Sequence, residues 1–268
     1  MAREPNDEFW VHKNLLRELI GAIAIVAIGL KKRREYIELQ KKFLTDKPKK
    51  DGILIFEGFS APQFPYFSLS VDLSKKLHIP SRVADFGKFN LHSYAEMMQL
   101  ADIGFLDMLS CFRLQRVHLI GHSLGGPVVL WLLGKHPESV GKVFCVASPS
   151  NPPFAETAWI PLQALISLVV AKFSFQKALL AEIVVSAQPY ADRITTISTA
   201  NDKILSQVAT HFPDNRATNI VYYFDSQKRK KTLSQQASNV LYDSHGGIVY
   251  HPETRKIVIQ TILDSLKK

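Results

Sequence analysis

The chain has 268 residues, of which 46% are hydrophobic and 21% charged, a balance typical of a globular protein rather than a disordered one. This length is within the range of a single large α/β domain, so we expect one core. The net charge of +9 is concentrated partly in three basic runs, Lys31–Arg34, Lys47–Lys50 and Lys228–Lys231. Such runs form a solvated surface or favour an anionic partner such as a membrane; no nucleic-acid motif accompanies them, so nucleic acid is not an expected partner.

Residues 1–50 differ from the rest of the chain. Their pattern predicts a helical arm from about Glu8 to Phe43, followed by the polar, basic linker "TDKPKKDG". The apolar run Leu19–Leu30 is a dozen residues long, whereas a membrane-spanning helix needs roughly 20. It favours a helix that packs on the domain or lies at a membrane surface; a short anchor within residues 15–34 remains open. No cleavage site of a signal peptide follows the run.

The two cysteines, Cys111 and Cys145, lie in apolar segments and belong to no CxxC or Cys/His cluster. Buried free thiols in a reducing compartment are therefore expected rather than a disulfide framework. Together with the missing signal peptide, this favours a cytoplasmic protein, peripheral to or weakly anchored in a membrane.

From residue 51 onward, short apolar runs alternate with amphipathic stretches. The predicted strands are Ile53–Phe56, Ser81–Phe86, Arg116–Ile120, Lys142–Ser148 and Arg193–Ser198. Helical spacing predicts helices at Ser93–Phe112, at about Leu124–Lys135 and at Glu253–Leu266. The segment that contains Gly58, Pro62 and Pro65 is predicted to be a loop. The alternation indicates a doubly wound α/β domain over residues 51–268, with a mostly parallel sheet flanked by helices.

The alternation lapses between residues 148 and 190. Two apolar helical segments there are interrupted near Phe173–Phe175 and have no strand partner. We expect an inserted helical cap, or lid; a plain buried helix pair is the alternative. A later strand is predicted at either Asn219–Phe224 or Asn239–Tyr242.

Ser123 lies in "GHSLG", directly after a predicted strand and directly before a predicted helix. This G-x-S-x-G pattern in that context is typical of a nucleophile elbow, in which a strained turn exposes the serine hydroxyl. Gly121 and Gly125 are the small neighbours that such a close turn requires. The structural alternative is a serine that merely joins a strand to a helix.

A serine nucleophile needs a base and an orienting carboxylate, expected in the chain order Ser, Asp or Glu, His. Among the three later histidines, His245 in the loop "DSHGG" is favoured over His251, which adjoins Pro252 and is expected in the first turn of a helix. Asp202 follows a predicted strand and is the favoured carboxylate. Asp225 and Asp243 remain competitors, whereas Asp192 precedes that strand and is at its wrong end. The backbone amides of Leu124 and Phe59 are the expected donors to the oxyanion.

These motifs make the chain resemble the α/β-hydrolases of the lipase and esterase type, from about Asp51 to Lys268. The resemblance rests on "VHLIGHSLGG", "EGFSA", "STAND" and "DSHGGIVYHP". It implies the α/β-hydrolase fold with eight mostly parallel strands, no metal or organic cofactor, and hydrolysis through an acyl-enzyme. Lipases of this type usually carry a histidine where this chain has Glu57, which makes the substrate polarity less predictable.

The sequence therefore predicts a serine hydrolase that cleaves a hydrophobic acyl ester or lipid. An acyltransferase, a thioesterase or an amidase would use the same residues. A non-catalytic binding protein with this fold, or a scaffold anchored by the arm, are alternatives of a different class.

Overall fold

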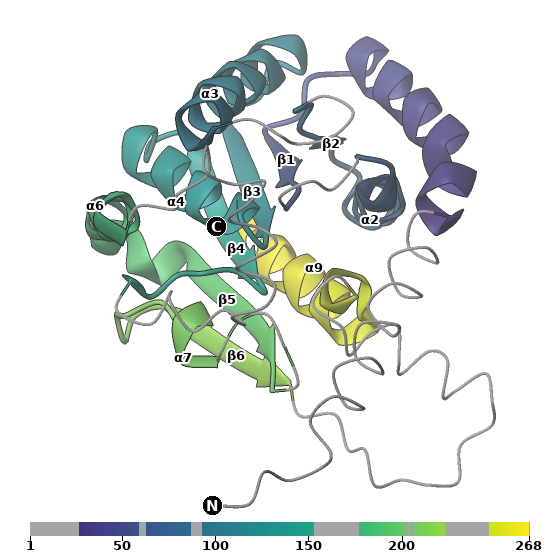
Figure 1. The fold of residues 1–268 in the computed structure, drawn as a ribbon. Coiled ribbons are helices and arrows are strands. Elements are labelled where there is room, and N and C mark those ends of the chain that lie inside the picture. Colours follow the sequence, from purple (N-terminus) through teal and green to yellow (C-terminus); the bar gives the residue numbers. More distant parts are fainter. Residues whose placement is uncertain are drawn as a thin grey trace, which may run out of the picture.

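The computed structural model describes residues 27–58, 63–86, 93–152, 177–200, 202, 205, 207–222 and 247–267. Within them, six strands form one parallel sheet in the order β2-β1-β3-β4-β5-β6 (Figure 1). The strands are β1 (Asp51–Phe56), β2 (Ser81–Val83), β3 (Arg116–His122), β4 (Val140–Val146), β5 (Ile194–Thr199) and β6 (Thr218–Tyr222). The predicted parallel sheet is confirmed, and β6 is the first of the two candidates for the later strand. The second candidate, Asn239–Tyr242, lies outside the described residues.

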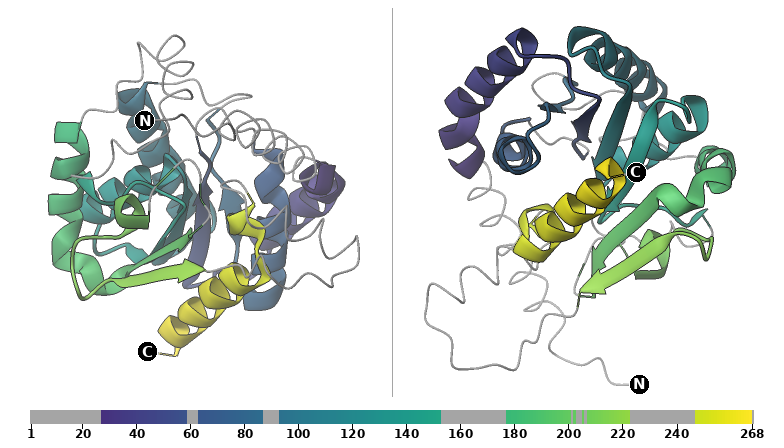
Figure 2. Two further views of the ribbon diagram at one scale, coloured as in Figure 1. Left: turned by 60° about the horizontal axis from the view of Figure 1, so that its bottom comes forward. Right: turned by 180° about the vertical axis from the view of Figure 1, so that it is seen from behind.

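Helices cover both faces of the sheet (Figure 2). The helices are α2 (Phe64–Leu77), α3 (Tyr94–Cys111), α4 (Gly125–Lys135), α6 (Lys177–Ala187), α7 (Gln207–Thr210) and α9 (Pro252–Leu266), with two 3-10 segments at Gln188–Arg193 and Ile248–Tyr250. Alternate residues of β1 face the two layers: Ile53 and Ile55 pack with α2 and α9, whereas Leu54 and Phe56 pack with α3 and α4. Burial on both faces explains why the strands are continuous apolar runs.

The chain moves outward from β1 in both directions, because β2 pairs with one edge of β1 and β3 with the other. Parallel sheets bind ligands beyond the carboxyl ends of the strands at such a switch point. The carboxyl ends of β1 and β3, neighbours in the sheet, therefore mark the position of a site.

Helix α2 corrects the sequence-based expectation, which placed Pro65 in a loop. Pro65 lies in the first turn of this helix. Proline is tolerated there because its missing N–H would have no partner within the helix and its fixed φ suits the helix start. The helical spacing of apolar residues after Pro65 therefore predicts this element better than the prolines, which suggested a loop.

Two other expectations concern the thiols and the cap. Cys145 is buried as expected, but Cys111 is exposed, with its Sγ 3.2 Å from Asp107 Oδ1. Helix α6, in the second half of the predicted cap region, buries Leu180 and Ile183 in the same core as α4. Residues 153–176, which would form the rest of a cap, lie outside the described residues.

Residues 27–45 form a helix, in keeping with the predicted arm, while residues 1–26 lie outside the described part. This helix packs beside α2, where the ring of Tyr36 stacks on Phe67 with centroids 4.4 Å apart. No helix among the described residues combines the length and apolar character needed to cross a membrane.

Candidate active site

Ser123 occupies the turn between β3 and α4 with a φ of 52°. A side chain in this left-handed region is strained by roughly 1–3 kcal/mol, and such strain persists where the surrounding structure enforces it. The turn is anchored on both sides of the serine: Ser123 N–H donates to Val146 O at 3.0 Å, and Gly126 N–H donates to Ser123 O at 3.1 Å. The strand, the strained residue and the helix are the parts of the predicted elbow.

The two elbow glycines allow backbone segments to touch. A Cβ added to Gly121 would lie 2.3 Å from the backbone oxygen of Gly125, and one added to Gly125 would lie 2.6 Å from the backbone oxygen of Phe56. Both obstacles are backbone atoms, which cannot rotate away as a side chain can. The contact of β1, β3 and α4 therefore depends on the absence of side chains at these positions.

Gly58 brings the loop after β1 against the serine. A Cβ added to Gly58 would lie 2.9 Å from Ser123 Cβ, so the backbone at Gly58 passes directly beside the serine side chain. This is where the predicted oxyanion loop should begin. Phe59, the predicted donor from that loop, lies outside the described residues.

Leu124, the other predicted donor, is the N-cap residue of α4. The N-terminal end of a helix carries partial positive charge and amide groups that favour an anion. The position beside Ser123 therefore suits a developing oxyanion.

Asp202 lies just beyond the carboxyl end of β5, as predicted. Its N–H donates to Thr199 O at 3.2 Å, and its Oδ1 accepts from the N–H of Leu205 at 3.0 Å. The short turn holds the carboxylate at the edge of the sheet that carries Ser123, two strands from β3. Asp192 belongs to the 3-10 segment before β5, at the opposite end of the strand.

The predicted base, His245, lies outside the described residues, as do the competing carboxylates Asp225 and Asp243. His251 caps helix α9, and its Nδ1 accepts from the N–H of Glu253 at 3.2 Å. This capping position agrees with the expectation that His251 belongs to a helix start.

A buried hydrogen-bonded pair of side chains adjoins the elbow, and no sequence motif marks it. Tyr66 Oη and His122 Nδ1 are 2.7 Å apart, and the backbone N–H of Gly58 also bonds to the Tyr66 hydroxyl. Tyr66 thus connects α2 to the ends of both β1 and β3. Sequence patterns gave it no role because the neighbouring Pro65 predicts a loop.

Glu57 is fully buried, and neither carboxyl oxygen has a hydrogen-bond partner within the described part of the chain. Burial, with a smaller contribution from the charge of Asp85, raises the pKa of Glu57 to about 9. The carboxyl is therefore neutral at pH 7. A neutral acid next to Gly58 leaves the positive field of the α4 N-terminus available to a developing oxyanion.

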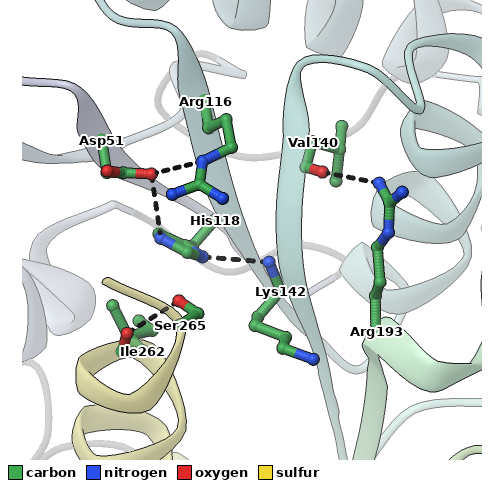
Figure 3. A network of polar contacts seen from close by, with 8 residues as sticks. All are labelled: Asp51, Arg116, His118, Val140, Lys142, Arg193, Ile262 and Ser265. Carbon is green, nitrogen blue, oxygen red and sulfur yellow. Dashed lines mark hydrogen bonds and ion pairs between the residues drawn. The ribbon is translucent and has the colours of Figure 1, made fainter. Parts of the chain in front are cut away.

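A second polar region lies at the opposite, amino end of the strands, beside a cavity of about 620 Å³ (Figure 3). Asp51 Oδ1 accepts from Arg116 Nε at 2.8 Å, and His118 Nδ1 accepts from the backbone N–H of Lys142 at 2.9 Å. Arg193 Nη1 donates to Val140 O at 3.1 Å. Burial lowers the pKa of His118 to about 4, so this histidine is neutral at pH 7. These bonds tie neighbouring strands together, far from Ser123.

Within the described residues, no group of three or more His, Cys, Asp or Glu side chains is placed to hold a metal ion. Ser123, the N-terminal end of α4 and Asp202 all lie at the carboxyl edge of the sheet.

A sequence model of the α/β hydrolase fold matches residues 72–235, more than half of the chain, and the protein belongs to this family. No curated protein matches the sequence. Among solved structures, Est1E from Butyrivibrio proteoclasticus is similar with a TM-score of 0.52 and 11% identity, covering 84% of this chain and 91% of Est1E. Est1E with bound ferulic acid gives a TM-score of 0.53 and 13% identity, covering 83% and 94%. At these identities the likeness establishes the fold alone.

Proposed function

We propose that the protein is a serine hydrolase of carboxylic esters with Ser123 as its nucleophile. The observation that carries the proposal is the strained φ of Ser123 between β3 and α4, in a turn held by backbone hydrogen bonds and made possible by glycines that let three backbone segments meet. A serine that only joined two elements would not need this strain. Membership of the α/β hydrolase fold family supports the same conclusion.

In the proposed reaction, Ser123 Oγ attacks the ester carbonyl carbon while His245 accepts the hydroxyl proton. Asp202 orients the imidazole and stabilises its positive charge. The amides of Phe59 and Leu124 donate to the oxyanion of the tetrahedral intermediate, each worth about 3–4 kcal/mol. His245 then protonates the leaving alcohol, and the acyl group remains on Ser123.

Water completes the cycle. His245 removes a proton from a water molecule, which attacks the acyl-enzyme, and the second tetrahedral intermediate collapses to a carboxylic acid and free Ser123. The substrate is proposed to carry a hydrophobic acyl chain, because residues 153–176 supply a long apolar sequence between β4 and α6.

Labelling with a fluorophosphonate probe tests the nucleophile. The wild type should form a covalent adduct, Ser123→Ala should form none, and Ser110→Ala, at an exposed position of α3, should label like the wild type. A folded wild type that does not label would contradict the enzymatic proposal and favour a binding protein with this fold.

A series of p-nitrophenyl esters tests the substrate class. The value of kcat/KM should rise from acetate to longer acyl chains and should be lost in His245→Ala and reduced in Asp202→Asn. If acetate is the best substrate, the hydrophobic acyl specificity is wrong. If activity survives in His245→Ala but not in His251→Ala, the assignment of the base is wrong.

A further inference from the structure

The helix of residues 27–45 is firmly docked through one face. In addition to the stacked ring of Tyr36, the Tyr36 hydroxyl accepts from the N–H of Val83 at 3.2 Å, and Gln40 Nε2 donates to Ser81 O at 2.7 Å. Phe43 packs against the core. Positions 36, 40 and 43 recur at helical spacing, so they define one inner face and leave the opposite face to solvent.

The solvent-exposed surface of this helix is its outer face, and large apolar side chains form a line along one flank of it, roughly 90° around the helix axis from the docked face. Leu30, Ile37 and Leu44 are separated by seven residues each, close to two helical turns, so they project in nearly the same direction. Their side chains are exposed by 51%, 40% and 48%. Nothing in the described part of the chain covers this line. Exposed apolar side chains that are aligned in this way indicate an interaction surface.

Cations occupy the rest of the outer face beside the apolar line. The exposed basic residues of the same helix are Lys31, Arg33, Arg34, Lys41 and Lys42. One exposed carboxylate, Glu38, opposes them and pairs with Arg34 at 3.0 Å. A strongly basic helix face that is bordered by an apolar line is complementary to an anionic bilayer surface, because the apolar side chains enter the interface while the cations contact lipid phosphates.

The helix lies at the β2 edge of the sheet, two strands away from β3, which ends next to Ser123. Along the helix, Tyr36 contacts the end of β2 and Gln40 its start, so the helix runs antiparallel to the strands at the β2 edge of the sheet (Figures 1 and 2). A bilayer against the outer face would lie alongside the strands. Ser123, beyond the carboxyl end of β3, is not part of the outer face that would contact the bilayer.

We propose that the outer face of helix 27–45 binds the surface of anionic membranes. A second copy of the chain is disfavoured as the occupant, because two such basic faces would repel each other. A nucleic acid would match the cations but would leave Leu30, Ile37 and Leu44 without an apolar partner. The proposal is independent of the proposed ester hydrolysis.

Flotation of the full chain with lipid vesicles tests the proposal. The wild type should bind vesicles of phosphatidylcholine with about one-third phosphatidylserine and bind pure phosphatidylcholine weakly. Lys31→Gln/Arg33→Gln/Lys41→Gln should lose on the order of 100-fold in affinity, at about fivefold per charge. Leu30→Gln/Ile37→Gln/Leu44→Gln should lose a similar factor, since each side chain buries its exposed half in the interface.

Matched control variants test whether the loss of binding is specific to this helix or follows from removing any exposed apolar or basic side chains. Ile103→Gln/Leu106→Gln removes equally exposed apolar side chains from α3, and Lys256→Gln/Lys267→Gln removes exposed charges from α9; both should bind like the wild type. Every variant should keep wild-type urea stability and fluorophosphonate labelling. These two readouts distinguish failure of this proposal from failure of the catalytic one.

Four outcomes would overturn the proposal. Equal binding to both vesicle types would remove the electrostatic basis, and full binding by the apolar triple variant would assign the membrane contact to another part of the chain. Binding of a DNA duplex at the same affinity as anionic vesicles would indicate a general polyanion surface. A lipid-free dimer that the apolar triple variant abolishes would make a second copy the occupant.

Discussion

Glu57→Gln should remove the decrease in stability with rising pH that Glu57 causes. Burial raises the pKa of Glu57 from its ordinary value of 4.5 to about 9, so the native state retains the proton at pH 7. The unfolded chain releases that proton above pH 4.5. The unfolded state then binds fewer protons than the native state. The contribution of Glu57 to wild-type stability is therefore greatest below pH 4.5 and falls as the pH rises toward 9.

The magnitude follows from the size of this interval. Between the two pKa values, each pH unit changes the free energy of unfolding by about 1.4 kcal/mol. From about pH 5.5 to about pH 8 the wild type should therefore lose about 3 kcal/mol through Glu57. Glutamine has nearly the same shape and does not titrate, so the stability of Glu57→Gln relative to the wild type should rise by that amount over the interval.

Urea unfolding followed by tryptophan fluorescence at several pH values measures this difference, and the contributions of all other titrating groups cancel in it. Glu182→Gln removes an exposed carboxyl from α6 and should follow the wild-type pH profile. A difference between Glu57→Gln and the wild type that stays constant with pH would refute the reasoning, because Glu57 would then ionise alike in the folded and unfolded states.

The other predictions concern the elbow and the buried histidines. Gly121→Ala should lower the free energy of unfolding in urea by about 3 kcal/mol, because the added Cβ would overlap backbone atoms. A Cβ added at Gly104 would have no atom within 4 Å, so the control Gly104→Ala should be neutral or stabilising in the same experiment. His118→Gln should lose less stability in acid than the wild type, since the unfolded histidine gains a proton below pH 6.5 that the native state excludes. Between about pH 7 and about pH 4, the losses of stability of the two proteins, followed by thermal unfolding, should differ by about 3 kcal/mol. Equal losses would place the pKa of His118 near its ordinary value. Tyr66→Phe should cost about 1–3 kcal/mol and slow fluorophosphonate labelling several-fold, because it breaks the bond to His122; unchanged labelling would limit Tyr66 to a structural role.

Local patterns predicted the elements around the elbow well. The strand before Ser123 and the helix after it were each placed to within a few residues, because a buried apolar run and a helical repeat are properties of contiguous sequence. The place of Asp202 at the end of β5 followed from the same reasoning. Helix α2 was not predicted, because Pro65 was interpreted as part of a loop although proline also suits a first turn.

Contacts between distant elements could not be predicted in this way. The bond between Tyr66 and His122 spans 56 positions, and the neutral state of Glu57 depends on burial created by the complete fold. The same is true of His118, whose pKa depends on neighbours from β1 and β4. The pairing of Asp202 with His245 and the cap remain predictions.

The exposure of Cys111 provides a practical route to the orientation of the protein on a bilayer. Since Cys145 is buried and the sequence has no other cysteine, a maleimide dye should attach to Cys111 alone without engineering. The hydrogen bond to Asp107 raises the pKa of the Cys111 thiol, so the coupling should be carried out at mildly alkaline pH. Energy transfer from this dye to labelled lipids would then report how far the end of α3 stands from the membrane.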